Sequence, residues 1–162
     1  MPFPNLKCFS FWIVLLIPSV FGAEALPTSD TILRILVADD APSNRKLLVS
    51  QLKKDFKKQT KGSFLTMEIL EAENGDQVIE SIRKQAVHAI ILDGVMPVRS
   101  GPDVLMEIAD EYPGYIVAWS GSIDHQDEML ALGAHSPLPK PYDVADVGDI
   151  LKEILKHVES ED

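Results

Sequence analysis

The sequence predicts an α/β fold, with a parallel five-stranded sheet covered by helices on both faces. Short apolar runs rich in β-branched residues alternate five times with stretches whose apolar residues recur at helical spacing. Most of these runs are continuous, which is typical of strands buried on both faces of a parallel sheet. Five successive β-α units therefore predict a doubly wound domain, with its ligand site at the carboxyl ends of the strands.

The first unit begins with Ile32–Ala38, a short β-branched run that ends at Asp39. We expect a strand there and a helix over Arg45–Lys58, and Pro42 is compatible with a first helical turn. The apolar residues that recur at helical spacing in this helix are Leu47, Leu48, Leu52 and Phe56.

The second unit joins a strand over Leu65–Ala72 to a helix over Asp76–Gln85, and Asn74-Gly75 forms the turn between them. Ala89–Leu92 is entirely apolar and predicts a third buried strand that ends at Asp93. The loop Ser100-Gly101-Pro102 then leads to a helix over Asp103–Glu111, which carries apolar residues at helical spacing.

The last two units follow the turn Pro113-Gly114. Tyr115–Trp119 predicts the fourth strand, and Gly133 stops the helix Asp124–Leu132. A short strand around Ser136–Leu138 comes next. The chain closes with an amphipathic helix over Val144–Val158, whose apolar residues form one stripe.

Residues 1–31 are expected to form a hydrophobic leader and linker, and residues 32–160 the folded domain. The apolar run from Phe9 to Phe21 is shorter than the roughly 20 residues that a membrane-spanning helix needs. A basic start at Lys7, the apolar run and Ala23-Glu24-Ala25 fit a signal peptide, and a mis-assigned start codon is the alternative. The expected location is cytoplasmic, with a membrane tether or export if the leader is real.

The composition excludes several classes of function. The net charge is −10, and an acidic surface is repelled by phosphate backbones, so we expect no nucleic-acid partner. Cys8 is the only cysteine, which excludes an intramolecular disulfide, a thiolate zinc cluster and a redox cysteine pair. The histidines have no metal-binding spacing and are expected at the surface; they are His88, His125, His135 and His157.

Polar residues follow the predicted strands at the edge where a parallel sheet binds its ligands. They are Asp39, Asp40, Asp93, Ser120 and Lys140. Each pair of carboxylates at about 4 Å costs roughly 4 kcal/mol at an effective dielectric near 20. Lys140 offsets part of this repulsion. A hard divalent cation with oxygen ligands would offset the rest, and Mg²⁺ is the usual ion where phosphate is also handled.

Five segments also carry the motifs of a known family. They are ILVADD (35–40), EAENG (71–75), IILDGVMPVRSG (90–101), VAWSGS (117–122) and LPKPY (138–142). The most specific is the pattern Asp93-x-x-Met96-Pro97-x-x-x-Gly101, together with Lys140-Pro141. With these segments the chain resembles the receiver domain of two-component response regulators, CheY-like proteins. The resemblance implies a flavodoxin-like (βα)5 fold with strand order 2-1-3-4-5, which agrees with the fold class predicted from the residues.

The resemblance further implies roles for the residues at the strand ends. Asp93 would be the phosphoacceptor, Ser120 the switch hydroxyl, and Lys140 the contact to the phosphoryl group. The implied Mg²⁺ ligands are Asp39, Asp40, Asp93 and, through its backbone carbonyl, Val95.

We therefore expect a stand-alone receiver that accepts a phosphoryl group from a sensor histidine kinase or a His-phosphotransfer protein. Phosphorylation would switch the binding of a downstream protein through the face formed by residues 124–132, 136–138 and 144–158. No enzymatic activity is expected beyond self-catalysed phosphorylation and dephosphorylation of Asp93. The alternative is a phosphorylation-independent pseudo-receiver that keeps only the fold. A phosphatase of the haloacid-dehalogenase type lacks its nucleophile, because Ile91 occupies that position.

The sequence departs from the family pattern at three positions. Pro137 stands where an aromatic residue is usual, three positions before the lysine. Trp119 precedes Ser120 where smaller aliphatic residues are usual, and strand alternation should point its ring away from the site, into packing or an interface. Val95 has no polar group to position water, which predicts a persistent acyl phosphate.

Overall fold

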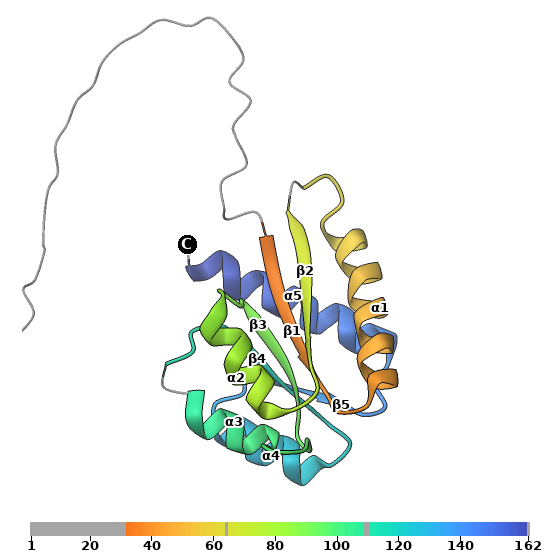
Figure 1. Ribbon diagram of the computed structural model, residues 1–162. Helices are drawn as coiled ribbons and strands as arrows, with labels where there is room; N and C mark the ends of the chain where they lie inside the picture. Colours follow the sequence, from red (N-terminus) through yellow and green to blue (C-terminus); the bar gives the residue numbers. More distant parts are fainter. Residues whose placement is uncertain (1–31, 64, 109–110, 162) are drawn as a thin grey trace, which may run out of the picture.

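The computed structural model describes residues 32–63, 65–108 and 111–161. Its centre is a parallel sheet with strand order β2-β1-β3-β4-β5 (Figure 1). The strands are β1 (Ile32–Ala38), β2 (Thr66–Ala72), β3 (Ala89–Asp93), β4 (Tyr115–Ser120) and β5 (Ser136–Pro139). The predicted fold class and strand order are confirmed. The predicted leader lies outside the described residues.

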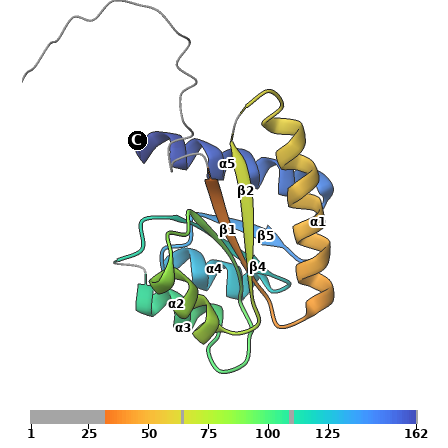
Figure 2. The same ribbon diagram turned by 45° about the horizontal axis from the view of Figure 1, so that its top comes forward.

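Helices cover both faces of the sheet, as Figure 2 shows. They are α1 (Pro42–Gln59), α2 (Gly75–Lys84), α3 (Gly101–Ile108), α4 (Ile123–Ala131) and α5 (Val144–Glu161). α1 and α5 pack on one face, and α2, α3 and α4 pack on the other, so each face has its own hydrophobic core. Strands β3 and β4 are buried at every position, which explains their continuous apolar sequence. Within the described residues, no helix has the length and apolar character needed to cross a membrane.

Two helices begin more than one residue earlier than the sequence predicts, because local polar contacts stabilise their first turns. Pro42 opens α1, and the Ala41 N–H just before it donates to the Asp39 carboxylate at 2.7 Å. At α3, the Ser100 hydroxyl accepts the Asp103 N–H at 3.3 Å, and the Asp103 carboxylate accepts the Ser100 N–H at 3.0 Å. This reciprocal cap sets the start of α3 at Gly101.

Not every apolar residue at helical spacing in α1 is buried, because the exposed fraction of Leu47 is 65%. Arg45, Leu48 and Leu52 are buried instead, at spacings of three and four residues. Leu47 lies beside this stripe and lines a groove of about 670 Å³, together with Val144 of α5. Leu47 therefore shares the helical spacing of the buried leucines but not their burial.

Two histidines that were expected only as surface residues form hydrogen bonds with strands of the sheet. The N–H of Arg34 in β1 donates to Nδ1 of His88 at 2.9 Å, and the His88 N–H donates to the Arg34 carbonyl at 2.9 Å. Ile116 in β4 and His135 repeat the arrangement at 3.0 and 2.7 Å. Each imidazole thus satisfies a strand N–H near the amino end of the sheet.

Candidate functional site

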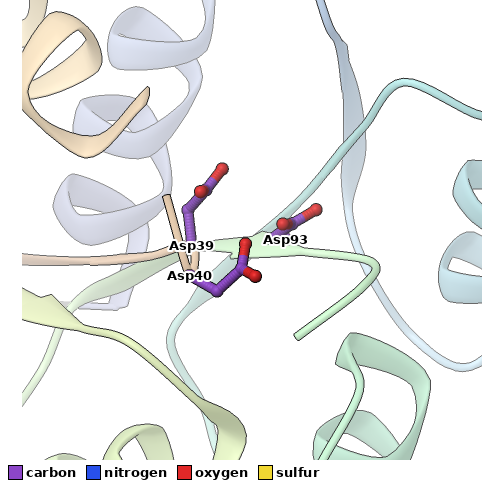
Figure 3. Close-up of side chains that lie close together, drawn as sticks. All are labelled: Asp39, Asp40 and Asp93. Atoms are coloured by element: carbon purple, nitrogen blue, oxygen red, sulfur yellow. The ribbon is translucent and has the colours of Figure 1, made fainter. Parts of the chain in front are cut away.

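Three carboxylates meet where β1 and β3 end side by side in the sheet (Figure 3). Asp39 and Asp40 follow β1, and Asp93 is the last residue of β3. One oxygen of each lies within 4.8 Å of the others. Asp39 and Asp93 are buried, whereas Asp40 is exposed. The convergence expected from the order of the strands is thus present.

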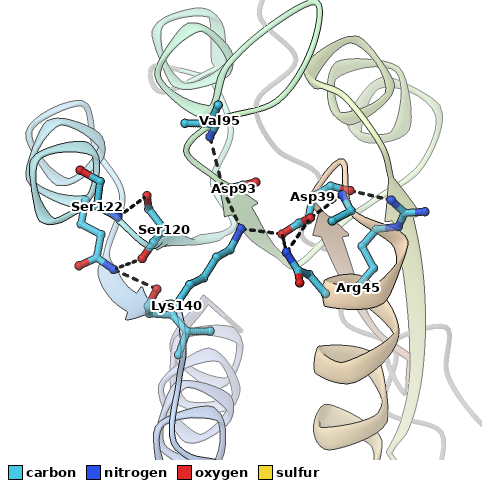
Figure 4. Close-up of polar contacts among 11 residues, drawn as sticks. Asp39, Arg45, Asp93, Val95, Ser120, Ser122 and Lys140 are labelled. Carbon is cyan, nitrogen blue, oxygen red and sulfur yellow. Dashed lines mark hydrogen bonds and ion pairs between the residues drawn. The ribbon is translucent and has the colours of Figure 1, made fainter.

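Lys140 reaches this cluster from the loop that follows β5 (Figure 4). Its Nζ lies 2.6 Å from Oδ2 of Asp39 and 2.8 Å from Oδ1 of Asp93. The lysine therefore bridges the two buried carboxylates. The peptide bond between Lys140 and Pro141 is cis.

The charge balance at Asp93 favours an additional cation. Burial raises the pKa of Asp93 above the ordinary carboxyl range, and the charge of Asp39 raises it further. The ammonium of Lys140 and the N–H of Val95, which donates to Oδ1 at 3.3 Å, lower the pKa but do not cancel the effect of burial. The ionised carboxylate thus lacks full compensation for its lost hydration.

The donor set fits Mg²⁺, which is bound through a few carboxylates while it keeps waters and takes phosphate oxygens. The cluster offers three carboxylates, and the exposed Asp40 leaves one side open to solvent. Val95 contacts Asp93 through its backbone N–H. The role of its carbonyl as a metal ligand stays a prediction.

Two residues of α1 that were not predicted as site residues fix Asp39 in place. Nδ2 of Asn44 donates to both oxygens of Asp39, at 3.3 and 3.1 Å. Arg45 is buried, and its Nη1 donates to the backbone carbonyl of Asp39 at 2.6 Å. The same guanidinium pairs with Glu71 and Glu73 at the end of β2, at 3.1 and 3.0 Å. The available signal was an arginine on the helical stripe that carries the buried leucines.

Ser120 ends β4 on the other side of Asp93 and is buried. A Cβ added to Gly94, the residue after Asp93, would lie 3.2 Å from the Ser120 Oγ, so the hydroxyl lies beside the loop that carries the aspartate. Its Oγ accepts the N–H of Ser122 at 3.1 Å. The side-chain amide of Gln126 in α4 donates to the carbonyls of Ser120 and Leu138, at 2.9 and 3.0 Å. Gln126, another residue that the sequence analysis missed, therefore ties the ends of β4 and β5 to α4.

The glycine of the Asp93-x-x-Met96-Pro97-x-x-x-Gly101 motif is required by a close approach. A Cβ at Gly101 would lie 2.5 Å from the Asp93 carbonyl oxygen and 2.9 Å from Cε of Met129. The Gly101 N–H also donates to the Gly94 carbonyl at 3.1 Å. Only glycine lets α3 begin this close to the residue that ends β3.

Trp119 is buried, in agreement with a packing role, but its ring does not point away from the site. The Nζ of Lys140 lies 4.2 Å from the centroid of the indole ring. The expectation that strand alternation removes this side chain from the site is therefore wrong, because Lys140 extends over the ring to reach Asp93.

Comparison with protein families matches residues 35–152 to the response regulator receiver domain. The chemotaxis protein CheY of Halobacterium salinarum is 26% identical over 125 residues, which cover 75% of this chain and 96% of that protein. The sporulation initiation phosphotransferase F of Bacillus subtilis is 29% identical over 125 residues, 75% of this chain and 93% of that protein.

Another relative is larger than this chain. A protein-glutamate methylesterase/protein-glutamine glutaminase 2 of Methanosarcina mazei is 30% identical over 116 residues, 69% of this chain. The match covers 29% of that protein, so the chain corresponds to only a part of it.

Solved structures share the fold. The response regulatory domain of mrkE from Klebsiella pneumoniae has a TM-score of 0.68 at 21% identity, covering 79% of this chain and 99% of that one. The signal receiver domain of an HD domain-containing protein from Pseudomonas fluorescens has a TM-score of 0.67 at 20% identity, covering 79% and 98%.

Proposed function

Since this chain belongs to the response regulator receiver domain family, we propose that it accepts a phosphoryl group on Asp93 and thereby switches the binding of a partner protein in two-component signalling. The observation that carries the proposal is the contact of Lys140 with both Asp93 and Asp39, beside the exposed Asp40. A phosphorylation-independent interaction module would not need this concentration of charge.

The geometry favours Oδ2 of Asp93 as the nucleophile. Among the described residues, the ammonium of Lys140 and the N–H of Val95 both contact Oδ1. Oδ2 would attack the phosphorus of a phosphohistidine or of a small acyl phosphate. An O–P bond forms as the bond from phosphorus to the donor breaks, and the donor nitrogen or oxygen leaves with the electron pair. Lys140 stabilises the negative charge on the transferring oxygens.

Asp39, Asp40 and Asp93 would hold Mg²⁺, which supplies the positive charge that neutralises the transferring phosphoryl oxygens. The protein's own contribution is to keep these carboxylates close together before the donor arrives. Asn44 and Arg45 do this for Asp39, because they fix its carboxylate and its backbone carbonyl. The Val95 carbonyl is proposed as a further ligand.

Ser120 would transmit the phosphorylation of Asp93 to the surface of the domain. Its hydroxyl accepts the Ser122 N–H at present, and rotation about the Cα–Cβ bond would let it donate to a phosphoryl oxygen. Gln126 joins the Ser120 carbonyl to β5 and α4. Movement at Ser120 would therefore shift the face formed by α4, β5 and α5. We propose this face as the binding surface for the downstream target.

The proposed phosphoryl donor is a sensor histidine kinase or a His-phosphotransfer protein. Such donors are phosphorylated in the cytoplasm, so we propose that the receiver domain acts there.

Intact-mass analysis after incubation with acetyl phosphate and Mg²⁺ tests the proposal. The full-length protein should gain one phosphoryl group, and Asp93→Ala should gain none. Asp149→Ala, an exposed aspartate of α5, is the matched control and should react like wild type. A chelator should prevent the reaction. An unmodified wild-type protein under these conditions would support the pseudo-receiver alternative instead.

A further inference from the structure

We propose that Trp119 is a positioning residue for phosphoryl transfer, whose indole ring holds the ammonium of Lys140 against Asp39 and Asp93. The inference rests on the proposed phosphoacceptor function. From the sequence, Trp119 is expected only in packing or at an interface.

The ammonium group of Lys140 contacts two carboxylates and one aromatic ring. An ammonium group has three N–H donors and no acceptor. Carboxylates lie 2.6 and 2.8 Å from Nζ, and the ring centroid of Trp119 lies 4.2 Å away. This separation is within the roughly 6 Å over which a cation interacts with an aromatic face, and tryptophan gives the strongest such interaction. The lysine side chain is only 20% exposed, so water screens the contact weakly.

The ring is itself held firmly. Trp119 is 1% exposed and sits in β4 opposite Asp93 of β3 and Leu138 of β5. Its carbonyl accepts the N–H of Gly94 at 3.3 Å, and the Tyr142 ring lies 6.4 Å from the indole, centroid to centroid. The buried ring therefore has a fixed position against which the flexible side chain of Lys140 can pack.

Packing alone does not account for a tryptophan here. Its Nε1 is buried and has no hydrogen-bond partner among the described residues. An unpaired buried donor destabilises a protein, so phenylalanine or leucine would fill this place without that cost. The larger, electron-rich indole face is what those residues lack, and Lys140 lies against it.

A double-mutant cycle tests whether Trp119 acts through Lys140. The initial rate of Asp93 phosphorylation by acetyl phosphate is measured by intact mass and normalised to folded protein. Trp119→Leu should slow the rate roughly 3- to 10-fold, and Trp119→Phe should slow it less because a weaker aromatic face remains. In the Lys140→Gln background, Trp119→Leu should change the rate less than about 2-fold, because coupled residues are not additive.

Leu52→Ala is the matched control for packing. Leu52 is fully buried in the same hydrophobic core as Trp119, and it comes from α1. Its loss should lower stability without changing the phosphorylation rate of the folded protein.

Tryptophan fluorescence provides a readout that a purely structural role would not affect. The chain contains two tryptophans, Trp12 and Trp119, so Trp12→Phe isolates the signal of Trp119. Phosphorylation should change the Trp119 emission, because Lys140 shifts toward the new phosphoryl oxygens. Lys140→Gln in the same background should abolish the change.

The outcomes separate this inference from the proposed function. If wild type is not phosphorylated on Asp93, both are overturned. If wild type is phosphorylated, the positioning role alone is overturned by a Trp119→Leu rate equal to wild type. It is likewise overturned by an equal slowing in the presence and absence of Lys140, or by a Trp119 emission that does not respond to phosphorylation.

Discussion

Among single residues, the site depends on buried side chains that bind the backbone of the acidic cluster on the side away from solvent. Arg45 is buried, and its guanidinium joins the Asp39 carbonyl to Glu71 and Glu73. Its partners come from the end of β2 and the loop after it, so one side chain links two neighbouring strand ends beneath the site. An arginine here is a structural requirement of the cluster, although it does not face the donor.

Replacing Arg45 should therefore be costly. Arg45→Gln is expected to lower the free energy of unfolding by about 2 kcal/mol, because a buried carbonyl loses its charged donor. Arg34→Gln is the matched control: Arg34 pairs with Glu68 at the surface, and its loss should cost less than about 1 kcal/mol. Urea denaturation measures both. Equal losses in the two variants would contradict the proposed importance of burial.

Val98 adopts a backbone conformation that β-branched residues rarely take. Its φ is 68°, in the loop between β3 and α3, and its side chain is 75% exposed. Asparagine tolerates this left-handed region, so Val98→Asn should raise the free energy of unfolding by about 1 kcal/mol. Val95→Asn, at an exposed valine of the same loop, should stay within about 0.5 kcal/mol of wild type. Thermal or urea unfolding of the two variants makes the comparison, and a destabilised Val98→Asn would rule out strain at this position.

Val95 bears on the lifetime of the phosphorylated state. Its side chain is 57% exposed two residues after Asp93 and carries no hydrogen-bonding group. Val95→Asn would place an amide where it can orient an attacking water, so the acyl phosphate should decay several-fold faster. The decay is followed by intact mass after the phosphodonor is removed. A half-life in Val95→Asn equal to or longer than that of wild type would refute the explanation.

Among the secondary-structure elements, two histidine rings continue the hydrogen bonding of the sheet beyond the amino ends of its strands. His88 and His135 precede β3 and β5, and each accepts a backbone N–H from the neighbouring strand. The same device thus serves two strand pairs, β1 with β3 and β4 with β5. Because Nδ1 is the acceptor, these histidines are bound to the sheet through the ring and the main chain together.

Removing one imidazole should leave a strand N–H without its acceptor. His88→Leu is expected to lower the free energy of unfolding by about 1 to 2 kcal/mol, since the Arg34 N–H is only partly accessible to water. His88→Asn retains an acceptor oxygen and should lose less. Chemical denaturation compares the variants, and hydrogen exchange at the Arg34 amide should be faster in His88→Leu. Unchanged exchange would show that the imidazole does not protect this amide.

At the scale of the whole molecule, the sheet and the last helix are joined at Tyr115. Its hydroxyl donates to Glu153 of α5 at 2.7 Å and lies 3.2 Å from Oγ of Ser136 in β5. Burial raises the pKa of Tyr115, and the neighbouring Glu153 adds to the increase while Ser136 opposes it. The phenol is therefore harder to ionise in the folded protein than in the unfolded chain.

This shift predicts how stability changes in alkali. A pKa raised by folding contributes stability that is complete below the unfolded value, about 10 for tyrosine, and is lost as the pH rises through the folded value. The free energy of unfolding of wild type should thus fall relative to Tyr115→Phe above about pH 10, and their difference should be constant below it. Urea denaturation across this range measures the difference, with tyrosinate absorbance reporting ionisation. Parallel profiles through this range would exclude the linkage.

The architecture and the position of the acidic site follow from the order of the residues along the chain. Apolar runs of β-branched residues separated by helical spacing fix five β-α units, and a parallel sheet brings its carboxyl ends to one edge. Asp39, Asp40, Asp93 and Lys140 could therefore be placed together from their positions after the strands, and the structure shows them in contact or close together.

The other side chains that meet at the site are brought together by the folding of the chain in three dimensions. Arg45 and Glu71 are 26 positions apart, and Arg34 and His88 are 54 apart, so no local pattern relates them. The ring of Trp119 lies under Lys140, and Leu47 faces a groove, because the rotation of a helix and the path of a side chain are set by close packing of neighbouring elements. Periodicity gives the face of an element, whereas the contact made by each residue on that face depends on the shape of what packs against it.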